Sequence, residues 1–361
     1  MTAGTARLPL TQPASTRRRT RTNYLLFPML GALLVLALLL NAGIGAVRIA
    51  PVQSLAILFD HLGIDLGVSY TGQQDAVLWA IRIPRMLLAA LVGASLGLAG
   101  AVMQGVFRNP LADPSLIGVS SGAALGAVIA IVFGVTILGA ATLPVAAFIG
   151  GLLATLAVYG CARHQGRIEV VTLVLTGIAL NAIAGAGIGF GTFMADDAQL
   201  RSIVFWSLGS VGGATWTAVL AVLPAIGLGI IVLPWWGRQL NLLVLGEREA
   251  RHLGLATERV RFLLIVLSAL VTGAAVSVAG IVGFVGLVVP HIIRLIAGPD
   301  HRTLLPASAL GGAILLLFTD LIARTAVIPR ELPLGVVTAM LGGPFFLWLV
   351  YRTRTIHGGW G

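Results

Sequence analysis

Long stretches without any charged residue alternate along the chain with short polar segments that are rich in arginine. A first apolar run covers residues 24–47, and charge-free runs follow at 86–107, 115–162, 170–195, 202–237, 262–293, 303–319 and 332–351. A helix that crosses a bilayer needs ~20 apolar residues. The pattern therefore predicts an all-α, polytopic membrane protein.

Three of these runs require a closer division. The run 115–162 is too long for one helix, so we expect two helices with a break around 134–144. The run 262–293 also exceeds one helix and is expected to turn near 279–283. The run 202–237 contains three early glycines, which predicts a short outer segment and then one helix from about Trp216. The total is about ten transmembrane helices.

Composition agrees with a location in lipid. The chain is 58% hydrophobic and 10% charged, with a mean hydropathy of +1.00, whereas a soluble domain carries roughly 25% charged residues. Small residues let membrane helices approach closely, and 46 of the 361 residues are glycine. We interpret the Gly-x-x-x-Gly spacings at 93/97, 118/122, 122/126, 185/189 and 187/191 as helix-packing sites. A single cysteine, Cys161, allows no intrachain disulfide and no metal-ligand pattern.

The basic residues are all arginine, and their placement indicates topology. A net charge of +10 is also typical of nucleic-acid binding, but ten crossings gather most of the arginines on one side. The loops of that side carry Arg108, Arg163, Arg167, Arg238, Arg248, Arg251, Arg259, Arg261, Arg294 and Arg302. Because cytoplasmic loops carry an excess of Lys and Arg, we expect both termini to be cytoplasmic.

The amino-terminal segment 1–22 holds five arginines and no acidic residue. This composition predicts a disordered basic cytoplasmic tail. The apolar run that follows is too long for the hydrophobic region of a signal peptide, so we expect an uncleaved first membrane helix. The transmembrane domain is accordingly assigned to 23–361.

The longest predicted cytoplasmic loop covers residues 237–261. Its segment 245–255 is expected to form a short surface helix, because Glu247 and Arg251 are spaced i, i+4 in the favourable order and Gly254 suits a C-terminal cap. A short charged helix outside the bilayer is a docking element for a cytoplasmic partner, and a solvated loop is the alternative.

Four arginines break the positive-inside rule on the outer face: Arg82, Arg85, Arg324 and Arg330. Two interpretations stay open, namely scattered anchors for lipid headgroups and a docking patch for an acidic protein, since guanidinium groups suit carboxylates. Asp320 precedes Arg324 by one helical turn, and a local ion pair would reduce the cost of burying it.

A second polar cluster lies near residues 290–302. His291 is a conceivable haem or metal ligand, but ligation needs a second donor that the sequence does not place nearby, which favours a structural role. Asp300, His301 and Arg302 are expected to cap and bridge helix ends.

No motif of catalysis is present. The sequence contains no Walker A loop, no His-Glu-x-x-His, no Gly-x-Ser-x-Gly and no mid-membrane carboxylate pair. Uphill transport would therefore need an external energy source. A membrane enzyme or a passive channel remains the alternative of a different class; an enzyme should show paired ionisable residues within its spans, and a channel would need neither a coupling loop nor an outer arginine patch.

Several ordered sequence blocks carry a resemblance to a known family. They are Arg-Ile-Pro-Arg (82–85), Met-Gln-Gly-Val-Phe-Arg-Asn-Pro-Leu-Ala-Asp-Pro (103–114), Gly-Phe-Val-Gly-Leu-Val-Val-Pro-His-Ile-Ile-Arg (283–294), Asp-His-Arg (300–302) and Glu-Leu-Pro-Leu-Gly-Val-Val-Thr-Ala (331–339). From about residue 45 onward the chain resembles the permeases of bacterial ABC importers for iron-siderophores, haem and cobalamin, which are vitamin B12-permease-like type II importers.

The resemblance implies a particular assembly. It implies a ten-helix permease domain, a homodimer in the bacterial inner membrane, two cytoplasmic ATP-binding cassette ATPase subunits and a periplasmic substrate-binding protein. ATP and Mg would be bound by the partner ATPase, and this chain would bind no cofactor, metal or nucleic acid and carry no catalytic residue.

The resemblance also implies roles for individual positions. Binding-protein docking falls on Arg82, Arg85, Arg324 and Arg330. The cytoplasmic gate falls on Asn109 and Leu111, with a second segment at Val170 and Val171. Coupling to the ATPase falls on Leu245, Gly246, Glu247, Glu249, Ala250, Arg251, Leu253 and Gly254.

The most detailed expectation concerns the substrate. Residues 195–214 look most like the haem-importing branch of the family. The helix at 170–193, which should line the pathway with Asn181 and Phe190, contains no His or Tyr. This composition suits a smooth conduit for a large planar ligand such as haem, and it equally suits a ferric siderophore or cobalamin.

Overall fold

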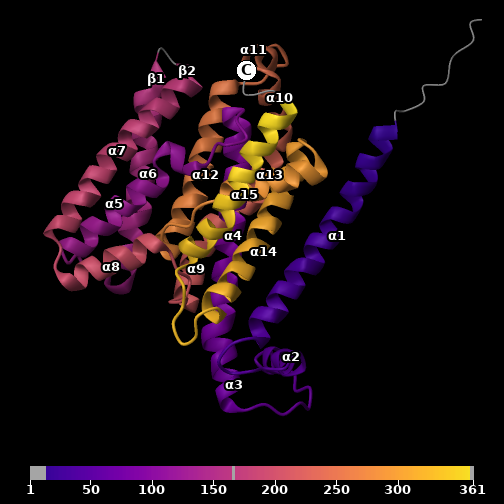
Figure 1. Cartoon of the computed structure of the whole chain (residues 1–361), viewed down its shortest axis with the longest axis vertical. Helices are drawn as coiled ribbons and strands as arrows, with labels where there is room; N and C mark the ends of the chain where they lie inside the picture. The colour runs from indigo at the N-terminus through magenta and orange to yellow at the C-terminus, as the bar shows by residue number, and fades with distance from the viewer. Residues whose placement is uncertain (1–13, 165–166, 358–361) are drawn as a thin grey trace, which may run out of the picture.

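The computed structural model describes residues 14–164 and 167–357, and Figure 1 shows that this part of the chain is a bundle of helices. Its α-helices are α1 (Ala14–Gly43), α2 (Pro51–Asp60), α3 (Gly72–Ala76), α4 (Ile83–Phe107), α5 (Val119–Val132), α6 (Thr142–Ala162), α7 (Val170–Met194), α8 (Asp197–Leu208), α9 (Trp216–Val232), α10 (Gly237–Leu245), α11 (Glu247–His252), α12 (Thr257–Ala279), α13 (Val285–Ala297), α14 (His301–Thr325) and α15 (Leu334–His357).

Short elements connect these helices. A π-helical segment, η1 (Val77–Arg82), joins α3 to α4 without interruption. Three 3₁₀ turns are η2 (Pro114–Ile117), η3 (Gly139–Ala141) and η4 (Leu233–Trp236). Two strands of two residues each, β1 (Arg163–His164) and β2 (Arg167–Ile168), pair in antiparallel fashion between α6 and α7.

The described residues confirm the prediction of about ten crossings. Seven segments are long and apolar enough to span a bilayer: Leu25–Gly43, Gly72–Phe107, Gly139–Ala162, Val170–Met194, Trp216–Leu245, Thr257–Ala279 and His301–Thr325. Three shorter apolar helices complete the set: Val119–Val132, Val285–Ala297 and Leu334–Leu349.

The predicted divisions of the long runs also agree with the helix ends. The break between α5 and α6 covers residues 133–141, and the turn between α12 and α13 covers residues 280–284. Helix α9 begins at Trp216, and the short outer segment before it is α8. These matches follow from glycine, because Gly134, Gly139 and Gly280 all have positive φ angles that end a helix readily.

The start of α1 differs from the prediction. The helix begins at Ala14, inside the segment 1–22 that we expected to be a disordered tail. Arginine is a good helix former, so a basic segment next to a membrane helix can continue that helix beyond the apolar run. Residues 1–13 of the predicted tail lie outside the described residues.

An excursion between α1 and α4 was not foreseen. Figure 1 shows α2 and α3 at the end of the bundle opposite α11. The His61 ring stacks on Trp79 with ring centroids 3.9 Å apart, and its Nε2 lies 2.8 Å from Asp75 Oδ1. Tyr70 donates a hydrogen bond to Asp60, which raises the pKa of the tyrosine to about 12. These contacts fold the excursion back onto the base of α4.

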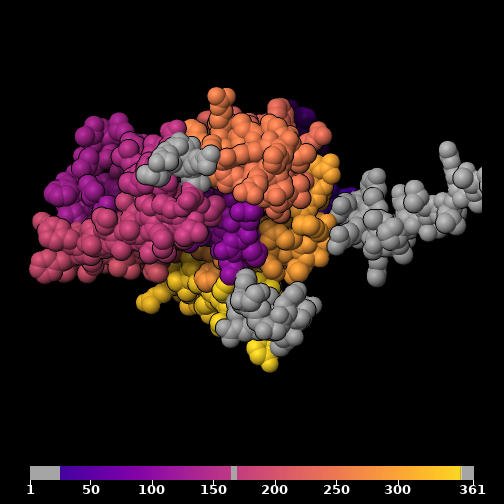
Figure 2. Space-filling view, turned by 90° about the horizontal axis from the view of Figure 1, so that it is seen from above, coloured from indigo at the N-terminus to yellow at the C-terminus, as the bar shows by residue number. Residues whose placement is uncertain are grey.

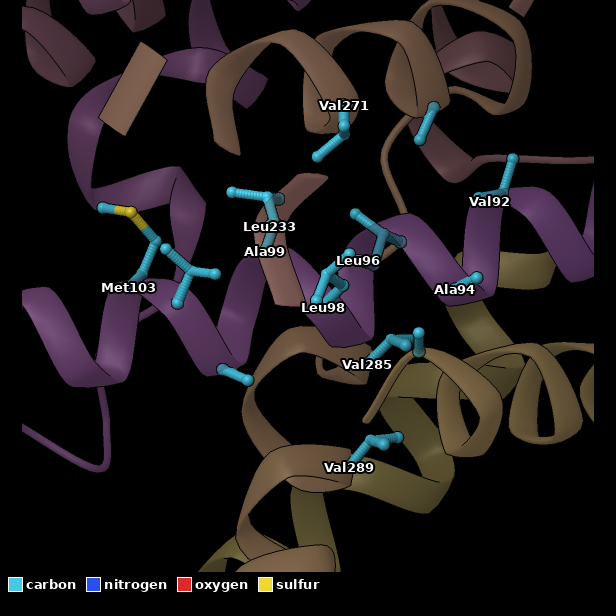
Figure 3. Close-up of a cluster of buried hydrophobic side chains, with 14 of the residues drawn as sticks. Val92, Ala94, Leu96, Leu98, Ala99, Met103, Leu233, Val271, Val285 and Val289 are labelled. Atoms are coloured by element: carbon cyan, nitrogen blue, oxygen red, sulfur yellow. The ribbon is translucent and has the colours of Figure 1, made fainter. Parts of the chain in front are cut away.

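Helix α4 lies at the centre of the bundle. It packs most extensively against α14 and also contacts α12, α13 and α9. Figure 3 shows Leu98, Ala99 and Met103 of α4 pointing among side chains of the neighbouring helices, and all three are fully buried. The core of the protein is therefore organised around this one helix.

Glycine sets the closeness of this packing. A Cβ added at Gly100 would lie 1.9 Å from the carbonyl oxygen of Gly286 in α13, and one added at Gly93 would lie 2.2 Å from that of Gly312 in α14. The spacing 93/97 is thus a packing site, as predicted, and so is 122/126 between α5 and α6. By contrast, Gly185 has open space around its Cβ position.

Substitution of these glycines tests the packing. We expect Gly100→Ala to destabilise the protein by ~1–3 kcal/mol or more, because the new methyl group overlaps backbone that cannot rotate away. Gly227→Ala of α9 is the matched control, since both residues lie inside long helices and a Cβ added at Gly227 meets no heavy atom within 4 Å. Thermal unfolding in detergent should show a lower Tm for Gly100→Ala only. Equal Tm values for the two variants would contradict the backbone contact.

Candidate functional site

The end of α4 that is predicted to face outward, called the outer end below, carries a buried charge cluster. Arg85 is 8% exposed and forms two ion pairs, one with Asp320 of α14 at 2.9 Å and one with Glu331 at 2.9 Å. Asp320 is 1% exposed, so it is a carboxylate withdrawn from solvent and matched by a guanidinium. An isolated charge at this depth would be costly, and the pair offsets that cost.

Two further arginines fasten α1 to this cluster. Arg82 donates to the carbonyl oxygen of Ala42, in the last turn of α1, and to that of Val47, just beyond it. Arg324 donates to the backbone oxygen of Asn41 at 2.7 Å and to its side-chain oxygen at 3.1 Å. The last carbonyls of a helix lack partners within the helix, so these arginines cap the end of α1.

This arrangement changes the prediction for the outer arginines. We expected a patch of four arginines available to a partner, but Arg82 and Arg85 are buried and the Arg324 guanidinium is turned toward α1. Asp320 also pairs chiefly with Arg85, and its distance to Arg324 is 3.9 Å. Only Arg330 is exposed. The physical reason is that the C-terminal end of α1 lies beside α4 and α14 here, and its last carbonyl oxygens need donors.

One polar position in the first apolar run marks a helix contact that the prediction missed. Asn41 is the single polar side chain near the end of the first apolar run, and it is fully buried. Its Nδ2 donates to Leu317 O of α14 at 3.1 Å, while its Oδ1 accepts from Arg324. A lone amide at the end of an apolar run therefore marked a helix contact.

The cytoplasmic gate was predicted at the turn that follows α4. Arg108 adopts a left-handed conformation with φ 51° and ends the helix. The Asn109 side chain accepts from the Leu111 N–H at 2.9 Å, which closes an Asx turn. Asn109 is exposed and Leu111 is half-buried. The turn is thus rigid and presents a polar side chain at the end of the bundle.

A cavity of 740 Å³ adjoins this turn. Its lining includes Asn109, Asn241, Arg294 and His301, and Arg294 Nη2 donates to Gln104 Oε1 at 2.7 Å. In Figure 2 the purple end of α4 is visible between the pink helices on the left and the orange residues on the right. This end of α4 is therefore open to the cytoplasmic side of the proposed topology.

The predicted coupling segment forms the short helix α11, in which Ala250 is fully buried. Its C-terminus is a Schellman motif: Leu255 N–H donates to Ala250 O at 3.0 Å, and Gly254 N–H donates to Arg251 O at 2.9 Å. Gly254 has φ 83°, which glycine adopts readily. The predicted cap at Gly254 is confirmed.

Charged residues hold α11 against the start of α12. Arg251 pairs with Glu247 one turn away, as the spacing predicted, and its Nε donates to Thr257 at 3.1 Å. Arg261 of α12 reaches Glu247 at 3.4 Å. Around this fixed base two apolar side chains project outward, since Leu245 is 62% exposed and Leu253 is 61% exposed. Gly246 is buried and Glu249 is exposed between them.

The remaining predicted residues lie on α7. Val170 packs against the core, whereas Val171 and Phe190 are exposed. Asn181 was expected on the transport pathway, but its amide is used inside the chain. Its Oδ1 accepts from the Ser121 hydroxyl, and its Nδ2 donates to Ser115 O at 3.2 Å. Asn181 therefore joins α7 to α5 and η2.

The cluster around residues 291–302 has the structural role that we expected. Asp300 caps α14 by accepting from Arg302 N–H at 3.0 Å and also accepts from Asn241 at 2.7 Å. The ion pair with Arg302 holds the pKa of Asp300 well below its usual range. Among the described residues no group of three His, Cys, Asp or Glu side chains is placed to hold a metal ion.

Removal of the buried carboxylate tests the outer cluster. Asp320→Asn removes one of the two carboxylates that pair with Arg85 and removes the nearby negative charge at Arg324. We therefore expect the protein to lose about 3–5 kcal/mol of stability. Asp197→Asn, an exposed acid in the first turn of α8, is the matched control. Thermal unfolding should separate the two variants. An unchanged Tm for Asp320→Asn would contradict the assigned ion pair.

Comparisons with known proteins agree with this arrangement. The family model described as the FecCD transport family matches residues 33–352. The hemin transport system permease protein HmuU of Yersinia pestis is 45% identical over 341 residues, covering 92% of this chain and 97% of that protein. The cobalamin import system permease protein BtuC of Halobacterium salinarum is 44% identical over 295 residues, covering 81% and 78%.

A solved structure shares the fold. It is described as an inward-facing conformation of a metal-chelate type ABC transporter, and it superposes with a TM-score of 0.80 at 33% identity, covering 91% of this chain and 99% of that chain. The match extends over nearly the whole helical bundle, and so includes both ends described above. The chain belongs to the FecCD transport family and is a transmembrane permease subunit of the ABC importer type.

Proposed function

We propose that this permease carries haem, or a related iron chelate, from the periplasm to the cytoplasm. The observation that carries the proposal is the placement of contact elements at the two ends of an otherwise uncharged bundle. Arginine and glutamate lie at one end, and the fixed helix α11 with exposed leucines lies at the other. A conduit worked by partners on both faces needs such an arrangement, whereas an enzyme would need paired ionisable groups within its spans.

Haem is favoured among the possible substrates by the likeness to a hemin permease over nearly its whole length. The apolar face of α7 adds support, because Ile183 and Phe190 are exposed and the helix has no His or Tyr. Such a surface offers no His or Tyr ligand to iron and permits a planar apolar ligand to slide. Cobalamin is the second candidate, because a cobalamin permease is almost as similar.

The same helix supports a homodimer. The spacing 185/189 leaves open space at both glycines within the chain, although small-x-x-x-small pairs usually mark helix contacts in membranes. Large apolar side chains flank these glycines, since Ile178 is 56% exposed and Phe193 is 86% exposed. A second copy would cover this face and enclose a pathway between the two subunits.

The proposed orientation places α11 in the cytoplasm of a bacterial inner membrane. Figure 1 shows that the first turns of α1 and the C-terminal end both lie at the same end of the bundle as α11. That end also carries most of the arginines, including Arg108, Arg248 and Arg302. Both termini are then cytoplasmic, and the cluster around Arg85 faces the periplasm.

Two ATPase subunits would supply the energy. The sequence has no phosphate-binding loop of its own, so ATP and Mg belong to the partner, and this chain needs no cofactor. Helix α11 with Leu245 and Leu253 would lie against the ATPase, and Arg251 would hold it rigid enough to transmit force. The gate at Asn109 and Leu111, together with Val170 and Val171, would open in response.

Uptake measurements test the substrate. Cells that lack haem uptake should grow on haem when they express this permease with its ATPase and binding protein, and they should accumulate little labelled cobalamin or ferric hydroxamate. Omission of the permease gene is the control. Preferential uptake of cobalamin or of the ferric hydroxamate would overturn the assignment to haem.

The coupling role predicts a strong effect of charge at the exposed leucines. Leu245→Asp combined with Leu253→Asp should abolish co-purification with the ATPase, because two buried carboxylates would face the interface. Ile137→Asp is the matched control, since Ile137 is 87% exposed in the loop between α5 and α6 at the opposite end. Transport that survives in the double variant would rule out this docking site.

The gate predicts proximity of symmetry-related residues. In a Cys161→Ser background, Asn109→Cys should form a disulfide across the dimer in at least one nucleotide state of the complex. Ile137→Cys in the same background serves as a control for random collision. If Asn109→Cys cross-links in no nucleotide state, the gate lies elsewhere.

A further inference from the structure

Arg85 divides its guanidinium between two carboxylates of very different exposure. Its inner edge donates to Asp320 from Nε at 3.0 Å and from Nη2 at 2.9 Å. Its outer edge donates to Glu331 from Nη1 and Nη2, each at 2.9 Å. The Asp320 side chain is 1% exposed and the Glu331 side chain is 47% exposed. One carboxylate is thus fixed, and the other is accessible to solvent.

The surroundings of Glu331 allow its side chain to move away. The residues from Ala326 to Glu331 are all exposed. Just after them Leu332 N–H donates to Ala323 O at 2.9 Å, which fixes the backbone beside Glu331. The side chain can therefore leave Arg85 by rotation about its own bonds, without unfolding of the loop.

The outer edge of Arg85 also has an open approach. The wall beside the pair is formed by Gly212, where an added Cβ would lie 2.9 Å from Glu331 Oε2. Ser210, Gly212 and Gly213 are exposed. No bulky side chain of this turn covers the pair, so a carboxylate from outside can reach the position that Glu331 occupies.

Among the other arginines of the cluster, Arg82 and Arg324 offer no edge that an outside carboxylate can reach, whereas Arg330 does. Arg82 and Arg324 are bonded to the end of α1, and release of either would leave helix carbonyls without donors. Arg330 is exposed and forms no ion pair with any described residue. Arg85 and Arg330 are therefore the two arginines that a periplasmic partner can engage.

We propose that Glu331 is an internal carboxylate that occupies the outer edge of Arg85 until a carboxylate of the docking protein displaces it. The inference rests on the proposed docking of an acidic binding protein on this face, and it names the residue that competes with that partner. Asp320 holds Arg85 in place throughout. The exchange replaces one ion pair by another, so a buried guanidinium is never left with an empty edge.

The exchange has a measurable consequence for docking. The internal pair opposes the partner, so weakening it should tighten the complex. Exposed ion pairs are individually weak, and we expect a gain in affinity of roughly twofold to fivefold. A rim charge that only contributes long-range attraction would instead act through the association rate and through salt dependence.

Two substitutions separate displacement from a general charge effect. Glu331→Gln removes the competing charge, whereas Glu331→Asp keeps the charge and shortens its reach to Arg85. Asp197→Asn repeats the charge change on an exposed acid of α8 at the same end of the bundle. Binding of the importer's own acidic binding protein would be measured on the complete importer in nanodiscs, at several salt concentrations.

We expect both Glu331 variants to bind the binding protein more tightly than the wild type, and Asp197→Asn to bind as the wild type does. Tighter binding by Glu331→Gln and Asp197→Asn but not by Glu331→Asp would show a long-range charge effect and overturn the proposal. Weaker binding by the Glu331 variants would also overturn it, because Glu331 would then support docking.

A second measurement needs no partner. Phenylglyoxal, an arginine-selective reagent, should modify Arg85 several-fold faster in Glu331→Gln than in the wild type, while Arg82 stays protected in both. Equal modification of Arg85 would overturn the displacement. If the affinity of the binding protein changes neither with Arg330→Glu nor with salt concentration, the proposed docking face is refuted, whatever the labelling shows. The failure of the docking face and the failure of the displacement are therefore distinguishable.

Discussion

The fold depends on the backbone contact between α4 and its neighbours α13 and α14. Lipid tails are as apolar as the helices themselves, so membrane helices associate through close packing and polar contacts rather than through the hydrophobic effect. Gly93 and Gly100 remove the side chains that would separate the backbones. The contact fixes α4 along its whole length, and this one helix carries Arg85 near one end and leads into the Asn109 turn at the other. Both candidate contact regions are therefore attached to the same rigid element.

Charge placement follows from this geometry. The outer end of the bundle has to accommodate the terminus of α1, and Arg82 and Arg324 supply donors to its last carbonyls. Asp320 offsets the resulting positive charge within the protein, and Glu331 offsets it at the surface. At the other end, α11 is fixed by its cap and its ion pairs, while the flanking Leu245 and Leu253 stay exposed. The arrangement accounts for a conduit whose chemistry is confined to its two faces.

The sequence predicted the helix count, the break between α5 and α6 and the cap at Gly254, because each depends on local properties such as run length and glycine conformation. It did not predict that Arg82 and Arg85 are buried, because their partners come from α1, α14 and the loop before α15, far away in the sequence. The start of α1 was missed for a different reason, since arginine-rich segments are compatible with both helix and disorder. The placement of Asn181 on the pathway stays a prediction, and the sequence did not show that its amide also joins α7 to α5 and η2, because Ser121 and Ser115 lie far from it along the chain.

We propose that the outer arginines divide into two that hold α1 and two that meet a partner. A structure of the complete importer with its binding protein docked tests this division. We predict a partner carboxylate on the outer edge of Arg85, Glu331 turned away, and Arg82 and Arg324 still bonded to the carbonyls at the end of α1. A docked complex in which Arg82 has left α1 to pair with the partner, while Glu331 stays on Arg85, would contradict the account.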